Sequence, residues 1–330
     1  LRRCGDEMDR SPDTKGQNVR YSSPAIKSLQ VLSSGWAEQH KEHRYGSWMP
    51  KTLWALLSRS WVKLPINYFL IEHRDGPVLF DTGLDPEILT DPTYISSPIG
   101  RFFLRRVFRF DATSGDKLDN VVKAAGFTSK AITRAVISHL HFDHIGGIKQ
   151  IPQAELIVSD REWAQLSTAH PERNWILREQ IEIPGARWQP IQFQPTDDPL
   201  LQGFDSAYDV AGDGSMVLLP TPGHTPGSLS MLIRQEGWRP ILLVGDLTYE
   251  AELLEKDITP GIGDAAELRK SYANVRHLKE QLPDLVIVPS HDFAAVDDIE
   301  RAIVSAAVPL SDAGPEELRR SHEITKNTPC

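Results

Sequence analysis

The feature that most constrains this chain is a dense run of metal-binding side-chain types at residues 139–147, which read HLHFDHIGG. His139, His141 and His144 supply three imidazoles, and Asp143 adds a carboxylate beside them. Imidazole nitrogen and carboxylate oxygen are the donors that zinc and neighbouring transition metals bind in proteins. Burying so many polar groups directly after a short apolar run would be costly without strong partners. The run therefore predicts a metal site at the end of a buried strand.

Three further donors follow later in the chain, and each comes shortly after another apolar run. They are His224, Asp246 and His291, and the runs before them are residues 216–219, 241–244 and 285–288. A lone histidine usually packs as an ordinary core residue, but an incidental histidine-rich loop would not bring three matching donors with it. Short apolar runs of this kind predict buried strands. We therefore expect the loops after these strands to converge on one metal centre at one edge of the fold.

Other local patterns place strands and helices around this centre. Residues 67–72 and 77–81 predict a hairpin, because the intervening Asp75-Gly76 is a strong turn dipeptide. Asp264 followed three residues later by Glu267 predicts the beginning of a helix. Together these patterns predict sheets whose loops meet at one edge, with helices outside them.

The order of these donors resembles the metallo-β-lactamase superfamily, whose motif HxHxDH is followed by a distant His, Asp and His. The resemblance runs from about residue 28 to about residue 293, and Asp81-Thr82-Gly83 looks like the superfamily's early structural aspartate. It implies an α/β fold, the αβ/βα four-layer sandwich. It also implies that one metal is held by His139, His141 and His224, that the other is held by Asp143, His144 and His291, and that Asp246 bridges the two.

The resemblance also implies the cofactor and the chemistry. We expect two divalent metal ions per chain, with zinc first and manganese, cobalt or iron as alternatives. Two ions about 3.5–4 Å apart share a water and lower its pKa towards roughly 7. When the resulting bridging hydroxide attacks a carbonyl carbon, the bond from that carbon to the leaving group is hydrolysed. Histidine at position 141 argues against the superfamily's di-iron oxygen-reducing branch, which usually has glutamate there.

Among hydrolases of this fold, the motifs look most like those of the quorum-quenching N-acyl-homoserine lactone lactonases. Tyr249 lies three residues after Asp246, and in that family a tyrosine at this offset points at the substrate carbonyl. We therefore expect Tyr249 to stabilise the oxyanion and Asp143 to pass a proton to the leaving group. Tyr249 could instead be a packing aromatic. A lactam, an aryl ester or a phosphotriester could use the same metals, and a non-catalytic metal-binding module is a further alternative.

An aromatic and basic segment at residues 101–110 is open to two interpretations. Its phenylalanines could cover an apolar acyl chain, but the interleaved arginines also fit an amphipathic helix that packs on the domain or forms a homodimer interface. The tryptophans before the first motif could likewise form a lid or pack in the core, and these are Trp36, Trp48, Trp54 and Trp61.

Composition sets the remaining expectations for this chain of 330 residues. Residues 1–24 are polar and predict a flexible extension, and residues 25–330 predict a single domain. The net charge of −9 argues against a nucleic-acid partner. No apolar stretch reaches the roughly 20 residues that cross a bilayer, so we expect no membrane partner and a cytoplasmic location. A small-molecule lactone is expected as substrate from the resemblance to the lactonases. Cys4 and Cys330 lie far from the histidine motifs and are excluded as ligands.

Overall fold

The computed structural model describes residues 24–304. Nearly all of the predicted flexible extension at residues 1–24 lies outside the described residues, as do Cys4 and Cys330. The proposal of one domain over residues 25–330 therefore stays a prediction. No helix in the described part is long and apolar enough to cross a membrane.

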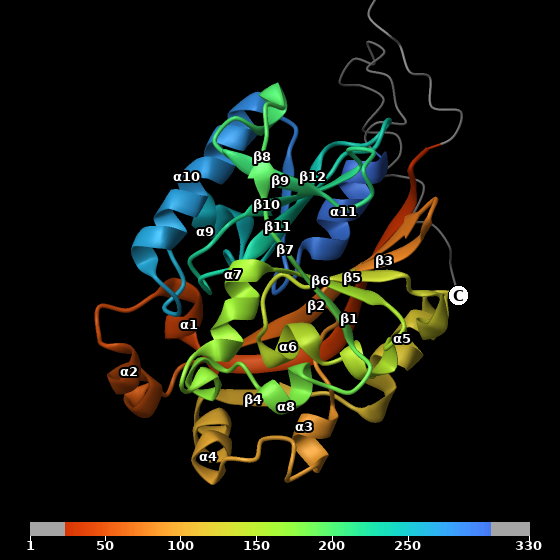
Figure 1. Cartoon of the computed structure of the whole chain (residues 1–330). Helices are drawn as coiled ribbons and strands as arrows, with labels where there is room; N and C mark the ends of the chain where they lie inside the picture. The colour runs from red at the N-terminus through yellow and green to blue at the C-terminus, as the bar shows by residue number, and fades with distance from the viewer. Residues whose placement is uncertain (1–23, 305–330) are drawn as a thin grey trace, which may run out of the picture.

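Two mixed sheets form the centre of the described structure (Figure 1). The first sheet runs, in order across it, through β4 (Phe108–Asp111), β1 (Ile26–His40), β2 (Trp61–His73), β3 (Gly76–Phe80), β5 (Arg134–Val136), β6 (Glu155–Ser159) and β7 (Arg187–Ile191). The second runs through β13 (Val286–Pro289), β12 (Ile241–Gly245), β11 (Leu229–Ile233), β10 (Met216–Pro220), β9 (Ser206–Asp209) and β8 (Gln194–Pro195). Parallel pairs join β3, β5, β6 and β7, and a further parallel pair joins β12 to β13.

Helices connect these strands and cover their outer faces. The α-helices are α1 (Lys41–Tyr45), α2 (Lys51–Leu57), α3 (Glu87–Thr90), α4 (Pro98–Val107), α5 (Leu118–Ala124), α6 (Phe142–Ile145), α7 (Asp160–Trp163), α8 (Arg178–Ile181), α9 (Ala251–Glu255), α10 (Ala265–Gln281) and α11 (Ala295–Val304). Short 3-10 helices lie at η1 (Ser114–Asp116), η2 (Ser129–Ala131), η3 (Ile148–Gln150), η4 (Ala164–Ser167), η5 (Pro171–Asn174) and η6 (Pro199–Leu201). As predicted, α10 begins after Asp264, whose side chain accepts hydrogen bonds from the backbone N–H groups of Ala266 and Glu267.

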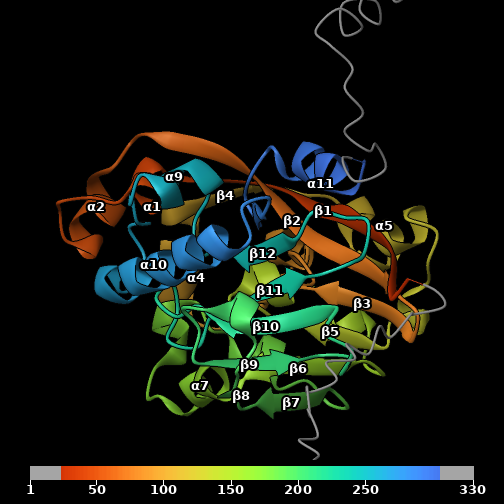
Figure 2. The same ribbon diagram turned by 90° about the horizontal axis from the view of Figure 1, so that it is seen from above.

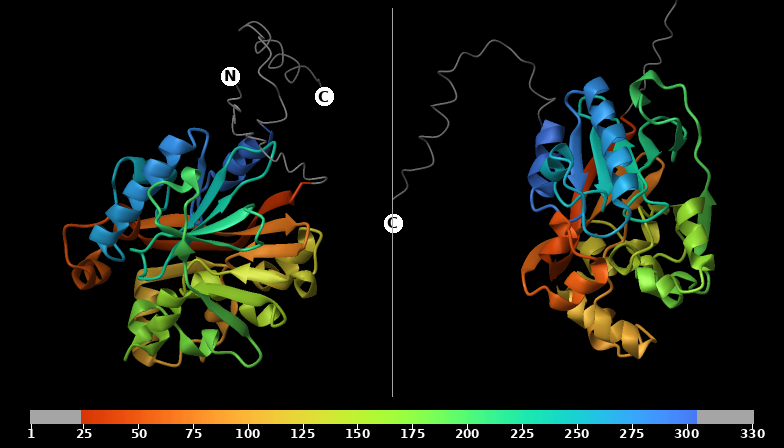
Figure 3. Two further views of the ribbon diagram at one scale, coloured as in Figure 1. Left: turned by 45° about the horizontal axis from the view of Figure 1, so that its top comes forward. Right: turned by 90° about the vertical axis from the view of Figure 1, so that its left-hand side faces the viewer.

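The alternation of side chains along β10 shows how the layers are held together. Met216 and Leu218 pack between the two sheets, whereas Val217 and Leu219 pack outward against α9 and α10. Successive residues of a strand point to opposite faces, so a strand that is buried on both faces is apolar throughout. Figure 2 shows α9 and α10 side by side, and Figure 3 shows the two sheets as neighbouring layers with helices outside them. This is the predicted αβ/βα sandwich.

The predicted hairpin is present, but its first strand is much longer than the sequence pattern indicated. β2 begins at Trp61 rather than near residue 67, and it pairs with β1 over most of its length. The extra residues form a strand because β1 supplies hydrogen-bonding partners, with Val62 opposite Gln39 and Trp61 opposite His40. Such non-local pairing leaves little trace in local sequence.

Candidate metal centre

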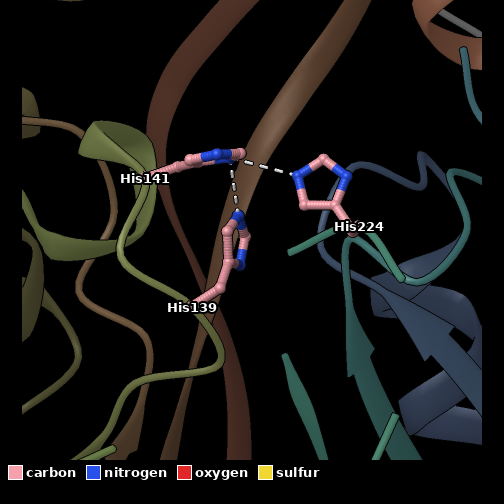
Figure 4. A group of neighbouring side chains, drawn as sticks. All are labelled: His139, His141 and His224. Carbon is pink, nitrogen blue, oxygen red and sulfur yellow. Dashed lines mark hydrogen bonds between the residues drawn. The ribbon is translucent and has the colours of Figure 1, made fainter. Parts of the chain in front are cut away.

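One group of three imidazoles joins the two halves of the sandwich. His139 and His141 lie in the loop between β5 and α6, and His224 lies in the loop between β10 and β11. The Nδ1 atom of His141 is 3.0 Å from Nε2 of His139 and 3.1 Å from Nε2 of His224. Figure 4 shows the three rings turned towards one another, two from the loop of His139 and His141 and one from the loop of His224. Three nitrogens this close are arranged as the ligands of one ion would be.

A second group lies next to the first. The side chains of Asp143 and His144, on α6, and of His291, after β13, have donor atoms within 4.8 Å of one another. Nε2 of His291 is 3.6 Å from Oδ2 of Asp143, and Nε2 of His144 is 3.9 Å from Oδ1 of Asp143. The structure thus brings together two sets of three donors in the combinations that the family resemblance implied, and His139, His144 and Asp246 form a third close set.

Asp246 lies between the two groups, directly after β12. Its Oδ2 atom is 3.5 Å from Nε2 of His224, and its Oδ1 atom is 3.2 Å from Nε2 of both His144 and His291. One carboxylate oxygen therefore faces each group. A carboxylate in this position could serve an ion in each group. All seven predicted donors thus meet in one place.

Unsatisfied buried atoms show that these residues fit metal ions. Nε2 of His144 and Oδ1 of Asp246 are buried and have no hydrogen-bond partner within the described structure, although they approach each other to 3.2 Å. A buried polar atom without a partner costs about 1–3 kcal/mol. Donors that face each other closely without hydrogen-bond geometry instead suit a cation between them. An ion bound there would satisfy both atoms at once.

Burial and neighbouring charges set the protonation of the donors. Burial lowers the pKa of His139 and His141 well below the usual range and that of His224 to about 4. These rings therefore stay neutral at pH 7 and keep a lone pair for an ion. Burial would also lower the pKa of His144, but the carboxylates of Asp246, Asp81 and Asp143 outweigh it and raise that pKa well above the usual range.

Asp81 orients the second group from behind. Its Oδ2 atom accepts hydrogen bonds from Nδ1 of His144 and from the Ser138 hydroxyl, both at 2.8 Å. Oδ1 accepts the backbone N–H of Ser138 at 2.7 Å. Because Nδ1 of His144 is held by Asp81, its Nε2 atom is the one turned to the centre. Partners of this kind fix the ring orientation of metal-binding histidines, and the role agrees with the structural aspartate that the family resemblance implied.

Glu162, on α7, is a supporting residue that the sequence did not reveal. It is fully buried, and its carboxylate accepts the backbone N–H of Leu140 at 3.0 Å, which lies between His139 and His141. It also accepts the Thr225 hydroxyl at 2.7 Å and the Gly227 N–H at 3.1 Å, both in the loop of His224. One carboxylate thus ties together the two loops that supply the first group of donors.

Tyr249 lies beside the second group of donors. Its ring stacks on that of His291, with centroids 5.4 Å apart, and only 2% of its surface is exposed. Its phenol hydrogen-bonds the side chain of Gln39, which no sequence motif had indicated. Burial raises the pKa of Tyr249 well above its ordinary value. The phenol therefore keeps its proton at every physiological pH.

A cavity of about 480 Å³ opens beside the first group. His141 and His224 line it, together with apolar side chains such as Trp175 and Ile176 and the cationic Lys51. Cavities of about 300–1,000 Å³ accept small molecules. Tyr249 is not among the residues that line this cavity.

The aromatic and basic segment at residues 101–110 divides into two parts. Its end packs in the core, where Phe108 and Phe110 make edge-to-face contacts with Phe142, the residue between His141 and Asp143. Its beginning belongs to α4, on which Phe102 is 62% exposed. The early tryptophans divide in the same way, since Trp54 is buried and Trp48 is exposed.

Comparison with known proteins agrees with this geometry. Residues 61–291 match the metallo-beta-lactamase superfamily. The chain is 31% identical over 247 residues to N-acyl homoserine lactonase AttM of Rhizobium radiobacter, covering 73% of this chain and 86% of AttM. It is 31% identical over 217 residues to the N-acyl homoserine lactonase of a Bacillus species, covering 66% and 76% of the two proteins. The crystal structure of B. thuringiensis AiiA with N-decanoyl-L-homoserine at its active site superposes with a TM-score of 0.64 at 22% identity, covering 82% of this chain and 94% of AiiA.

Replacing Glu162 tests whether it holds the first group of donors together. Glu162→Ala leaves three donors in the ligand loops without their acceptor, so the free energy of unfolding should fall by roughly 3 kcal/mol or more. Loss of such a supporting partner should also weaken metal binding about 10–100-fold. Urea denaturation and competition with a chelator measure the two effects. The control is Glu155→Ala at the beginning of β6, which removes a partly exposed carboxylate that pairs with Arg134. It should leave metal affinity unchanged and cost at most about 1 kcal/mol of stability. Equal metal affinity in wild type and Glu162→Ala would refute the role.

Proposed function

We propose a lactonase activity for this chain, which belongs to the metallo-beta-lactamase superfamily and is a metal-dependent hydrolase. The proposed reaction is the opening of the ring ester of an N-acyl-homoserine lactone. The observation that carries the proposal is the matched region, because residues 61–291 contain all seven donors and Tyr249. Relatives that are 31% identical to this chain over the aligned 247 and 217 residues are named as N-acyl homoserine lactonases.

We further propose that the seven donors hold two divalent ions, with zinc as the first choice. One ion would be held by His139, His141 and His224, the other by Asp143, His144 and His291, and Asp246 would serve both. When bound, the ions supply a hydroxide nucleophile at neutral pH and polarise the ester carbonyl. The protein's own contribution is to orient the donors and to exclude water around them, which Asp81 and Glu162 support through the hydrogen bonds described above.

Asp143 is the donor best placed to act on the substrate. Its side chain is 14% exposed, whereas those of His144, His291 and Asp246 are at most 5% exposed. A carboxylate that is open to the substrate can take a proton and pass it to the alkoxide oxygen that leaves the ring carbon. Opening the lactone breaks the bond between the ring carbonyl carbon and the ring oxygen. Once protonated, that oxygen becomes the homoserine hydroxyl.

Replacing Asp143 by asparagine separates this role from metal binding. Asp143→Asn keeps the size and one oxygen donor but cannot carry the proton, so kcat should fall about 10²–10⁴-fold. Bound metal, measured by elemental analysis of the same samples, should fall much less. If activity fell in strict proportion to bound metal, Asp143 would act only as a metal ligand and not as a proton donor.

Tyr249 would stabilise the oxyanion that forms on the carbonyl oxygen. Its phenol is protonated, because burial raises its pKa, and it can therefore donate. Gln39 can present an amide N–H to the phenol oxygen, which leaves the phenol's own proton for the substrate. Gln39 is thus a positioning residue in this proposal, and the stacking on His291 fixes the ring beside the second group.

A substrate panel on zinc-loaded protein tests the proposal directly. The panel compares acyl-homoserine lactones, simple γ- and δ-lactones, a lactam, an aryl ester and a phosphotriester. We expect the highest kcat/KM on acyl-homoserine lactones, and we expect Tyr249→Phe to lower kcat on them by up to roughly 10²-fold, since one oxyanion donor is lost. The phosphotriester rate should change less, because its oxyanion lies elsewhere.

The control for this panel is Tyr208→Phe, which removes a phenol from β9, away from the donors. Its rates should equal those of the wild type, and the metal content of all three proteins should agree. A preference for the lactam or the phosphotriester would replace the lactone proposal. Equal rates for wild type and Tyr249→Phe on every lactone would remove Tyr249 from the mechanism.

A further inference from the structure

Two stretches of this acidic protein carry only basic charges. The chain has a net charge of −9, yet residues 43–71 and 92–110 contain no aspartate or glutamate. Their lysines and arginines are Arg44, Lys51, Arg59, Lys63, Arg101, Arg105, Arg106 and Arg109. The two stretches contain α2 and α4, which pack against each other in the structure. Arg44, Lys63 and Arg109 pair with the acidic Glu250, Asp111 and Glu38 from outside these stretches. Within the described residues the other arginines of the two stretches have no acidic partner, so the unpaired positive charge lies on and around α2 and α4.

The same part of the surface exposes large apolar side chains. Trp48 is 93% exposed, Ile99 is 70% exposed, and Leu57 and Phe102 are each 62% exposed. In the part of the chain that the structure describes, Val304 is the only other large hydrophobic side chain exposed to this extent. Clustered apolar exposure of this kind marks an interaction site. We call Trp48, Leu57, Arg59, Ile99, Phe102 and Arg105 the α2–α4 surface.

The arginines here differ in whether the protein already uses them. Arg106 joins the two helices, because its guanidinium donates to the backbone carbonyls of Leu56 and Ser58. Arg109 lies over the Trp61 ring at 4.0 Å. Arg59 and Arg105 have no partner among residues 24–304, and both line an open groove of about 490 Å³. Two guanidinium groups thus face outward, ready to bind anions.

We propose that the α2–α4 surface docks on an anionic lipid bilayer. Exposed aromatic and aliphatic side chains enter the boundary between headgroups and acyl chains, while basic side chains bind the lipid phosphates. This combination needs no membrane-spanning segment, so it is compatible with the absence of one in the described structure. It revises the sequence-based expectation of no membrane partner, which considered only spanning segments.

Charge argues against the two other occupants of this surface. A second copy that docked through the same face would bring Arg59 and Arg105 of both copies together, and like charges repel. The other occupant would be one of the chain's own terminal segments, and these offer little opposite charge. Residues 1–23 have five basic and four acidic side chains, and residues 305–330 have three basic and four acidic side chains. Figure 1 also shows α11 and the beginning of β1 at the opposite end of the molecule from α2 and α4.

Docking in this way would place the cavity near the bilayer. Lys51, the first residue of α2, lines the cavity beside His141 and His224. A substrate with an acyl chain partitions into membranes, so an enzyme held at the surface meets it at higher concentration. The docking itself does not depend on the proposed lactonase activity, and binding to vesicles can be measured without any substrate.

Vesicle flotation with the full chain tests the proposal. We expect binding to vesicles of phosphatidylcholine with 30% phosphatidylglycerol, little binding to phosphatidylcholine alone, and weaker binding in high salt. Each arginine near an anionic surface strengthens binding about fivefold, so the double variant Arg59→Glu/Arg105→Glu should lose at least about 25-fold. Lys123→Glu/Lys130→Glu makes the same change in charge at exposed residues on and after α5 and is the matched control.

The apolar half of the surface is tested by Ile99→Ser/Phe102→Ser, with the exposed Leu200→Ser as its control. The double variant should lose vesicle binding while its circular dichroism spectrum and melting temperature stay close to those of the wild type. Equal binding to neutral and anionic vesicles, or equal losses in test and control variants, would overturn the proposal. It would also be overturned by a dimer in solution that Ile99→Ser/Phe102→Ser dissociates, together with no binding to any vesicle, since a second copy would then be the occupant.

Discussion

The burial of five imidazoles and two carboxylates at one edge of two sheets is the constraint on which this structure depends. Such groups are costly to desolvate unless each is paired. The protein pairs them in two ways: the donors face each other around positions suited to cations, and their backs are held by buried residues. Asp81 holds His144, the backbone carbonyl of Pro65 accepts Nδ1 of His291 at 2.8 Å, and Glu162 holds the loops of the remaining histidines.

The sequence revealed the donors but not most of the residues that hold them. Histidines and aspartates after apolar runs are unusual enough to be recognised locally. The order of the seven donors resembled that of a known superfamily, and this resemblance predicted the fold. Glu162 has no such signature, because its role arises only where the loop of Leu140 meets that of Gly227. The two loops pack so closely there that a Cβ atom on Gly227 would lie 2.0 Å from the backbone nitrogen of Glu162. Gln39 was missed for the same reason, as its partner Tyr249 is distant in sequence.

The cavity that would receive a substrate is lined mainly by parts of the chain other than the donors. The cavity beside His141 is lined by Lys51 from α2, by Trp175 after η5 and by Ile262 before α10. Family membership and the hydrolase class follow from the matched region and the relatives. In the proposed function, the segments around the cavity would determine what is hydrolysed. Helix α2 connects this cavity to the exposed basic and apolar surface.

The central claim is that these seven side chains form one centre for two metal ions. Elemental analysis of protein reconstituted with zinc and freed of excess metal tests it most directly, with wild type and Asp246→Ala measured side by side. Because Asp246 faces both groups of donors, the account predicts two ions per chain in the wild type and a loss at both positions in the variant. One ion or none in the wild type, or two tightly held ions in Asp246→Ala, would contradict it.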